Sequence, residues 1–221
     1  MKDSGEDLLI EYGAYIASDA DAVATLLADV FPRRDPLAVA VGLTSPEFEA
    51  FVRTLLPMAA EERLTIVARL ANTGDIVGVM LTNDPACEPA DGMETLSEKF
   101  GPIGSILGKL IITYRAGREP RPGEMLHLYL LGVSDRVAGK GVGRRLVSAA
   151  VENGARRGYR VAVAEATNRV SQHIFLSLGF AARAQIAYLD FSFRGQHVFQ
   201  SIAEHGGPAL MEKLLTTGRI Q

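Results

Sequence analysis

Glycines alternate with other residues just after a long apolar segment near the middle of the chain. Residues 125–133 have the apolar character of a buried strand, and glycine then occupies every second position from Gly139 to Gly143, where an amphipathic segment begins. Glycine lets the backbone turn tightly with its N–H groups outward, and the first turn of a helix carries partial positive charge. Three basic residues lie in or beside the turn: Lys140, Arg144 and Arg145. The pattern therefore predicts an anion site, which these cations would strengthen.

Four interpretations compete for this turn. A dinucleotide-binding fingerprint requires Gly or Ala where Arg144 stands, and a nucleoside triphosphate loop requires Ser or Thr where Gly141 follows Lys140. A cradle for the pyrophosphate of coenzyme A has neither requirement. A tight turn without a ligand explains the glycines but leaves the basic residues unexplained.

A second segment supports the coenzyme A interpretation. It begins at Asn168, has the small residue Ser171 three positions later, and ends in the pair Gly179-Phe180. The two segments together resemble the paired cofactor motifs of the GNAT superfamily of N-acetyltransferases, in the family's order and separation. They span about Met125 to Phe180.

The sequence departs from the family pattern at two positions. Ala138 stands where the first motif usually has Gln or Arg, and Arg136 is a candidate to compensate. Phe175 stands where family members often carry a general-acid tyrosine. The family makes most pyrophosphate contacts through backbone amides, so we expect the Ala138 departure to leave binding intact.

The resemblance implies acetyl-coenzyme A as co-substrate, direct attack of an amine on its thioester, and no metal. It assigns thirteen residues to cofactor binding: Leu131, Gly132, Val133, Ala138, Gly139, Lys140, Gly141, Val142, Gly143, Arg144, Asn168, Ser171 and Phe175. The backbone N–H groups of residues 131–133 would polarise the thioester carbonyl, and Phe175 would pack against the pantetheine arm.

Two residues are candidates for the general base. Deprotonating an alkylammonium at pH 7 costs about 4.6 kcal/mol, so a base or a water relay to one matters. His127 lies where several family members carry an acidic base, and an ordinary histidine suits that work near neutral pH. A strand histidine whose hydrogen bonds are satisfied and whose role is purely structural is an equally good interpretation.

Asp35 is the other candidate. Residues 31–37 and the following Gly42-Leu43 resemble the early segment of insect arylalkylamine N-acetyltransferases, in which a glutamate before Pro-Leu is taken as the base. Asp35 is one methylene shorter, so we expect it to act through a bridging water. An aspartate that serves only the turn before Pro36 is the alternative.

No residue is an obvious general acid, because phenylalanine at position 175 cannot donate a proton. A thiol with a pKa near 8.5 makes the acid dispensable, and Ser171 and Tyr188 are the available substitutes. Cys87 lies outside both motifs, and we do not expect it to be a nucleophile.

Composition narrows the class of protein. The 221 residues are 48% hydrophobic and 22% charged with a net charge of −3, which suits a soluble domain and disfavours a nucleic-acid partner. The single cysteine excludes an intramolecular disulfide and a cysteine-cluster metal site. We expect a cytoplasmic protein with no membrane span, whose partner is a small-molecule amine. The sequence leaves a homodimer open.

The periodicity predicts how these residues are positioned. Strands are expected at residues 8–16, 64–71, 76–81, 125–133, 159–164, 185–193 and 197–202, and helices after residue 19, at 45–60, around 93–114, at 141–157, at 171–178 and from 206 onward. A strand–turn–helix–strand crossover places two parallel strands side by side. The expected fold is α/β: a GNAT fold with a mixed, mostly antiparallel central sheet, helices on both faces and a splayed parallel pair that binds the cofactor. We predict one domain, residues 1–221, with a helical insertion at about 84–122.

The predicted reaction is transfer of acetyl from acetyl-coenzyme A to a primary amine of a small molecule. A protein lysine or N-terminal acetyltransferase is one alternative, and a non-catalytic coenzyme A-binding regulator is another. The expected insertion closes over a small substrate more naturally than it opens a peptide groove, which favours the first reading.

Overall fold

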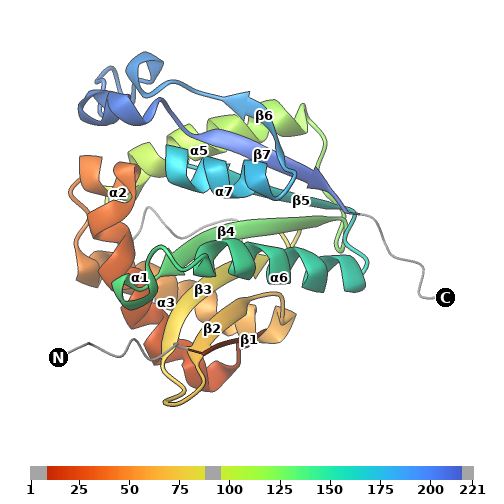
Figure 1. Cartoon of the computed structure of the whole chain (residues 1–221). Helices are drawn as coiled ribbons and strands as arrows, with labels where there is room; N and C mark the ends of the chain where they lie inside the picture. The colour runs from red at the N-terminus through yellow and green to blue at the C-terminus, as the bar shows by residue number, and fades with distance from the viewer. Residues whose placement is uncertain (1–8, 88–95, 216–221) are drawn as a thin grey trace.

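The computed structural model describes residues 9–87 and 96–215, and its centre is one mixed β-sheet (Figure 1). The strand order is β1-β2-β3-β4-β5-β7-β6, and of these neighbouring pairs only β4 and β5 run parallel. The strands are β1 (Ile10–Ala14), β2 (Ile66–Leu70), β3 (Ile76–Asn83), β4 (Met125–Val133), β5 (Val161–Ala166), β6 (Ala181–Gln185) and β7 (Ala209–Leu214). The expected mixed, mostly antiparallel sheet is confirmed.

Helices cover both faces of the sheet (Figure 1). One face packs against α6 (Val142–Arg156) and α7 (Arg169–Ser177), and the other against α1 (Ala20–Arg34), α3 (Ser45–Glu62) and α5 (Phe100–Arg115). The short helix α2 (Pro36–Ala40) follows α1 directly. Each long helix buries an apolar stripe, which is the main source of its stability.

The parallel pair β4–β5 separates after a short contact. Pairing covers only residues 125–127 of β4 and 161–163 of β5. Beyond that point β4 stays with β3 and β5 stays with β7, so the two strands diverge toward the side where α2 lies (Figure 1). A bulge contributes, because Leu81 and Thr82 of β3 face Leu130 and Leu128 and leave Tyr129 as the extra residue. The predicted splayed pair is present.

Most expected elements are confirmed with shifts of a few residues. The hairpin of β2 and β3 turns at residues 71–75, and α1 buries Val23, Leu26, Leu27 and Val30 along one face. The N-cap of α3 is Thr44, which forms a capping box with Glu47. The expected helix around 93–114 begins at Phe100, and Met93 lies outside the described residues.

The last part of the chain contradicts two predictions. Residues 185–193 and 197–202 do not form a strand hairpin; only the turn at Arg194-Gly195 is formed, closed by an isolated bridge between Phe193 and Gln196. Two short 3-10 helices form here instead, η3 (Tyr188–Asp190) and η4 (Gln200–His205), and Tyr188 and Phe199 bury their rings beside them.

The expected closing helix after residue 206 is also wrong. Residues 209–214 form β7, which lies between β5 and β6 and pairs with β5 along its whole length. The spacing of Leu210 and Leu214 resembles one face of a helix, but Leu214 is 71% exposed while Leu210 is buried. Pairing with two neighbouring strands satisfies the backbone here and outweighs local helical spacing.

Candidate active site

The glycine-rich turn connects β4 to α6 through the 3-10 helix η2 (Asp135–Val137). Gly139 and Gly141 both have φ of 74°, a left-handed conformation that costs other residues steric energy. A Cβ built on either glycine would meet no atom within 4 Å. The turn therefore presents bare backbone to open space, as close approach of a ligand requires.

The amino end of α6 is open for an anion. Gly141 is the N-cap and no side chain from the described residues caps it, so the first amide groups keep their donors. Lys140 and Arg144 are exposed beside it. Arg145 instead stacks over the ring of Tyr12 at 4.8 Å. These features fit a pyrophosphate group, whose charge the helix end and two cations would balance.

Other predicted cofactor residues have structural roles in packing. Gly143 packs against β4, where a Cβ would lie in ordinary contact with Leu131 and Val133 at 3.6 Å. Gly132 is more tightly confined, because its Cβ would clash with Leu27 of α1 at 2.6 Å. Val142 is buried in the core below the turn, whereas Ala138 is exposed on it.

The second motif begins α7 with a capping box. The side chain of Asn168 accepts a hydrogen bond from the backbone N–H of Ser171 at 2.9 Å, and the Ser171 hydroxyl donates to the Asn168 carbonyl. Phe175 is buried and packs edge-on against Phe180, with ring centroids 5.0 Å apart. The cofactor contacts predicted for these residues, and the catalytic role of Ser171, stay predictions.

His127 lies on the opposite face of the sheet and is the last residue of β4 that pairs with β5. Its Nε2 is 2.7 Å from Oε2 of Glu165 on β5, and both side chains are almost fully buried. The two residues therefore span the strands where they begin to separate. Burial is the largest influence on the pKa of Glu165 and would raise it. The adjacent His127 ring, a backbone hydrogen bond and the charge of Arg115 together outweigh burial, and the pKa is lowered.

Asp35 lies at the open end of the same gap. It is the N-cap of α2, with Oδ1 accepting from the Ala38 N–H at 3.0 Å, and the backbone turns there because Pro36 follows. Oδ2 accepts from the hydroxyl of Thr167, the residue that follows β5, at 2.6 Å. Burial raises the pKa of Asp35, and these hydrogen bonds oppose it only in part.

The fold brings the two candidate bases to the carboxyl end of β5. Glu165 is hydrogen-bonded to His127, and Thr167, two residues later, is hydrogen-bonded to Asp35. Tyr188 adds to this group, because its hydroxyl donates to the Thr167 carbonyl at 2.7 Å. That bond and the raised pKa of Tyr188, caused by burial and by Asp35, make this tyrosine a poor general acid.

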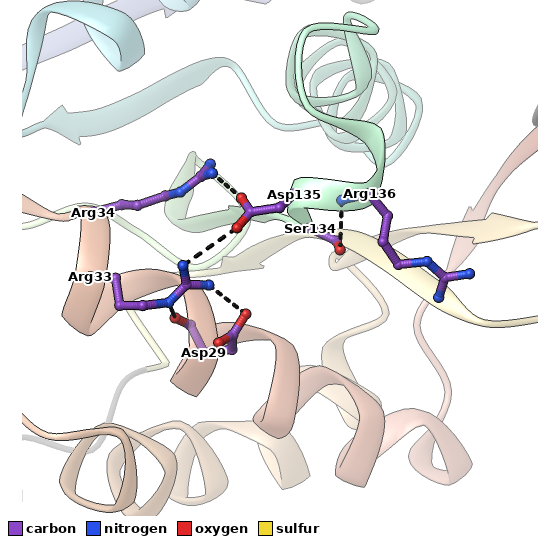
Figure 2. Close-up of polar contacts among 6 residues, drawn as sticks. All are labelled: Asp29, Arg33, Arg34, Ser134, Asp135 and Arg136. Atoms are coloured by element: carbon purple, nitrogen blue, oxygen red, sulfur yellow. Dashed lines mark hydrogen bonds and ion pairs between the residues drawn. The ribbon is translucent and has the colours of Figure 1, made fainter.

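An ion-pair cluster joins the Asp35 segment to the glycine-rich turn (Figure 2). Asp135 of η2 receives ion pairs from Arg33 and Arg34 at the end of α1. Arg136 points away from this cluster in Figure 2 and pairs with Asp75 at 3.1 Å. That pairing fixes Arg136 on the β2–β3 turn, so nothing in the geometry supports its expected compensation for Ala138.

Sequence reasoning missed Glu165, Thr167 and Asp135. Glu165 is the one charged residue in a strand that otherwise reads Val-Ala-Val-Ala-Ala, and a lone buried charge signals a functional or paired group. Thr167 and Asp135 carried no comparable signal. Cys87, by contrast, is exposed with a pKa raised by partial burial and nearby carboxylates, which does not suit a nucleophile.

No described helix is long and apolar enough to cross a membrane. Within residues 9–87 and 96–215, no three His, Cys, Asp or Glu side chains gather as metal ligands would.

Comparison with known proteins settles the family. The model of the acetyltransferase (GNAT) family matches residues 42–180, which is more than half of the chain. The protein belongs to the GNAT acetyltransferase family. No protein of curated function matches it by sequence.

Several solved structures share the fold over nearly the whole chain. Arylalkylamine N-acetyltransferase 2 from Aedes aegypti is 25% identical, with a TM-score of 0.78 over 94% of this chain and 99% of its own. The C-terminal condensation domain of Ebony, solved with β-alanyl-dopamine, has a TM-score of 0.85 at 14% identity over 94% and 99% of the two chains. Drosophila melanogaster polyamine N-acetyltransferase reaches 0.73 at 22% identity over 94% and 100%.

Proposed function

We propose that this GNAT acetyltransferase uses acetyl-coenzyme A to acetylate the primary amine of a small molecule. The observation that carries the proposal is the separation of β4 from β5. Beyond the end of β4 lie the glycine-rich turn and the uncapped start of α6, and between the two strands lies the buried His127–Glu165 pair. The two sides match the two needs of the reaction: an anion site for the donor and a base for the acceptor.

The donor side is expected to work through its backbone. Acetyl-coenzyme A, when bound, supplies an acetyl group activated as a thioester. The N–H groups at Gly139 to Gly143 and the first turn of α6 would hold its pyrophosphate. The part of β4 from Leu131 to Val133 pairs with β3 and has no strand beside its other edge among the described residues, so its free N–H groups could polarise a carbonyl.

The acceptor side must remove a proton from the attacking amine. We assign this role to His127, oriented by Glu165, with Asp35 as a second acceptor that reaches the amine through water. The raised pKa of Asp35 brings it closer to neutral pH, where a carboxyl is a more effective base. Ser171 stays a catalytic candidate from the family pattern alone, because its hydroxyl already serves the α7 cap.

A small acceptor suits the geometry better than a peptide. The start of α2 is tied to the end of β5 by the Asp35–Thr167 bond, and α1 is tied to the glycine-rich turn by the Arg34–Asp135 pair. These links cross the open side of the split, where an extended peptide would need to lie. Among the structural neighbours, the Aedes aegypti and Drosophila melanogaster enzymes are named for arylalkylamines and polyamines.

Thiol release tests the proposal. Purified protein is incubated with acetyl-coenzyme A and separate panels of arylalkylamines, polyamines and lysine or N-terminal peptides, with Gly141→Glu as the donor-site control. We expect turnover on at least one small amine and none in the control. Turnover confined to peptides would favour a protein acetyltransferase. Coenzyme binding by calorimetry without turnover on any amine would favour a regulator.

A further inference from the structure

A small cavity lies against the His127–Glu165 pair on the α5 face of the sheet. Its volume is about 30 Å³, and residues of α5, β4 and β5 line it, among them Arg115, Met125, Val163 and both members of the pair. We call it the inner cavity. It is large enough for one water molecule.

Two buried polar atoms make the inner cavity a hydration site. Oε1 of Glu165 and Nε of Arg115 are buried, and neither has a hydrogen-bond partner among the described residues. An unpaired carboxylate oxygen in a protein interior is costly. One water between these atoms would accept from the guanidinium and donate to the carboxylate, so each group would be satisfied.

The inner cavity leads outward, away from the donor side. A larger pocket of about 360 Å³ shares Tyr114, Arg115 and Met125 with it and extends to Arg160 and Glu212. This outer pocket lies at the amino ends of β4 and β5, since Met125 and Val161 begin those strands and both line it. The glycine-rich turn follows the other end of β4. Arg115 thus stands between the buried pair and solvent.

We propose that Glu165, a water in the inner cavity and the outer pocket form an exit route for the proton that His127 removes from the amine. This proposal rests on the proposed function. Acetylation of R–NH₃⁺ by acetyl-S-CoA gives the amide, CoA–SH and one H⁺ released to solvent. The proton passes from His127 Nε2 to Glu165, then to the water and the outer pocket, while donor and acceptor occupy the cleft.

Each residue on the route has a distinct role. Glu165 is a positioning residue for His127 and carries the proton in transit. Its lowered pKa keeps it anionic at rest, so that it holds the proton only briefly before passing it on. Arg115 donates to the water and orients it. The charged and titratable groups that face the pair are Arg115 and Tyr114 from α5 and Tyr129 from β4. Farther out, Glu212 of β7 accepts a hydrogen bond from the Tyr114 hydroxyl and lines the outer pocket.

The first test replaces the carrier. Glu165→Gln keeps the shape and a hydrogen bond to His127 but cannot relay a proton. We expect single-turnover acetyl transfer to slow about tenfold or more, with unchanged coenzyme A affinity. Because the carboxylate favours the protonated ring, its loss also moves the acidic limb of the pH–rate profile to lower pH. Glu165→Asp should recover part of the rate, which a purely structural role would not predict.

The second test fills the cavity. Val163→Ile adds one methyl group to the inner cavity, about the volume of the water it would displace, whereas Val161→Ile on the same strand lines only the outer pocket. We expect slower single-turnover transfer and a larger solvent deuterium isotope effect for Val163→Ile alone. Wild-type rates and isotope effects in both Glu165→Gln and Val163→Ile would overturn the route.

The two proposals fail in distinguishable ways. Absence of turnover on every amine defeats the proposed function. Turnover that none of these changes affects defeats the exit route only. A crystal structure of the wild-type chain provides a check without activity: ordered water between Glu165 Oε1 and Arg115 Nε is expected, and a dry inner cavity would overturn the route even if an amine is acetylated.

Discussion

The two sides of the split between β4 and β5 use different chemical groups: backbone amides on one side and side chains on the other. The proposed donor side is a continuous piece of chain, from the end of β4 through Gly139 and Gly141 to α6, and it has exposed backbone amides in its turn. The acid–base side consists of buried side chains, with Asp35, His127 and Glu165 contributed by three separate elements.

This difference follows from what each side must do. Binding an anion needs many weak, fixed dipoles, and successive N–H groups in a tight turn supply them with little desolvation. Moving a proton needs groups whose ionisation is sensitive to their surroundings, and burial next to a partner gives that sensitivity. Changes on the donor side should therefore affect binding, and changes on the other side should affect rate and pH dependence.

The largest effect is expected from Gly141→Glu. A carboxylate at this position would lie next to the predicted pyrophosphate, and two like charges about 4 Å apart cost about 4 kcal/mol near a protein surface. We expect coenzyme A affinity to fall at least about 100-fold in calorimetry. Gly74→Glu is the matched control, because Gly74 has nearly the same left-handed φ in the β2–β3 turn and equally open space. Equal loss in both variants would show that backbone strain, not the anion site, is responsible.

His127→Gln comes next and should separate the two sides most clearly. The amide keeps a hydrogen bond to Glu165, which avoids leaving that carboxylate buried alone, but it cannot accept a proton at neutral pH. We expect kcat to fall about 100-fold, within the range for loss of a general base, with coenzyme A affinity unchanged. His173→Gln, on an exposed position of α7, is the control. A normal kcat would remove His127 from the mechanism.

Asp35→Asn should lower kcat about tenfold while leaving the fold intact or more stable. The folded-state pKa of Asp35 is raised, so its ionisation costs stability as pH rises above the unfolded value near 3.9. A neutral amide avoids that cost and keeps the α2 cap. Thermal unfolding should show a gain over wild type at pH 7 that disappears near pH 4, and Asp190→Asn at an exposed site should show none. A variant less stable than wild type at pH 7 would contradict this account.

The smallest effect is expected from Asp135→Ala. It removes the ion pairs that connect α1 to the donor turn, all of them exposed (Figure 2). Exposed pairs contribute about 0.2–1 kcal/mol each, so KM for the donor should rise no more than about threefold, and less at high salt. Asp75→Ala breaks the neighbouring Arg136 pair and serves as control. A large fall in kcat would mean that the ion pairs of Asp135 also position the acid–base residues.

Prediction from sequence succeeded where the signal is local. β4 was predicted at its observed bounds, and α6 and the β2–β3 hairpin within a few residues, because apolar runs, glycines and helix starts lie next to one another in the chain. Prediction failed in the last part of the chain. There β7 inserts between β5 and β6, and only pairing with distant strands decides that residues 209–214 are extended.

The sequence by itself identified the family, and it predicted the glycine-rich turn as the donor site and a short set of candidate bases. It named His127 and Asp35 separately and could not relate them. The tertiary structure decided that His127 and Asp35 are both hydrogen-bonded to residues at the carboxyl end of β5, Glu165 and Thr167 respectively. It also placed the His127–Glu165 pair beside a cavity lined by Arg115. The physical reason is that a backbone anion site is encoded by neighbouring residues. The ionisation of a buried side chain instead depends on which distant residues the fold places beside it.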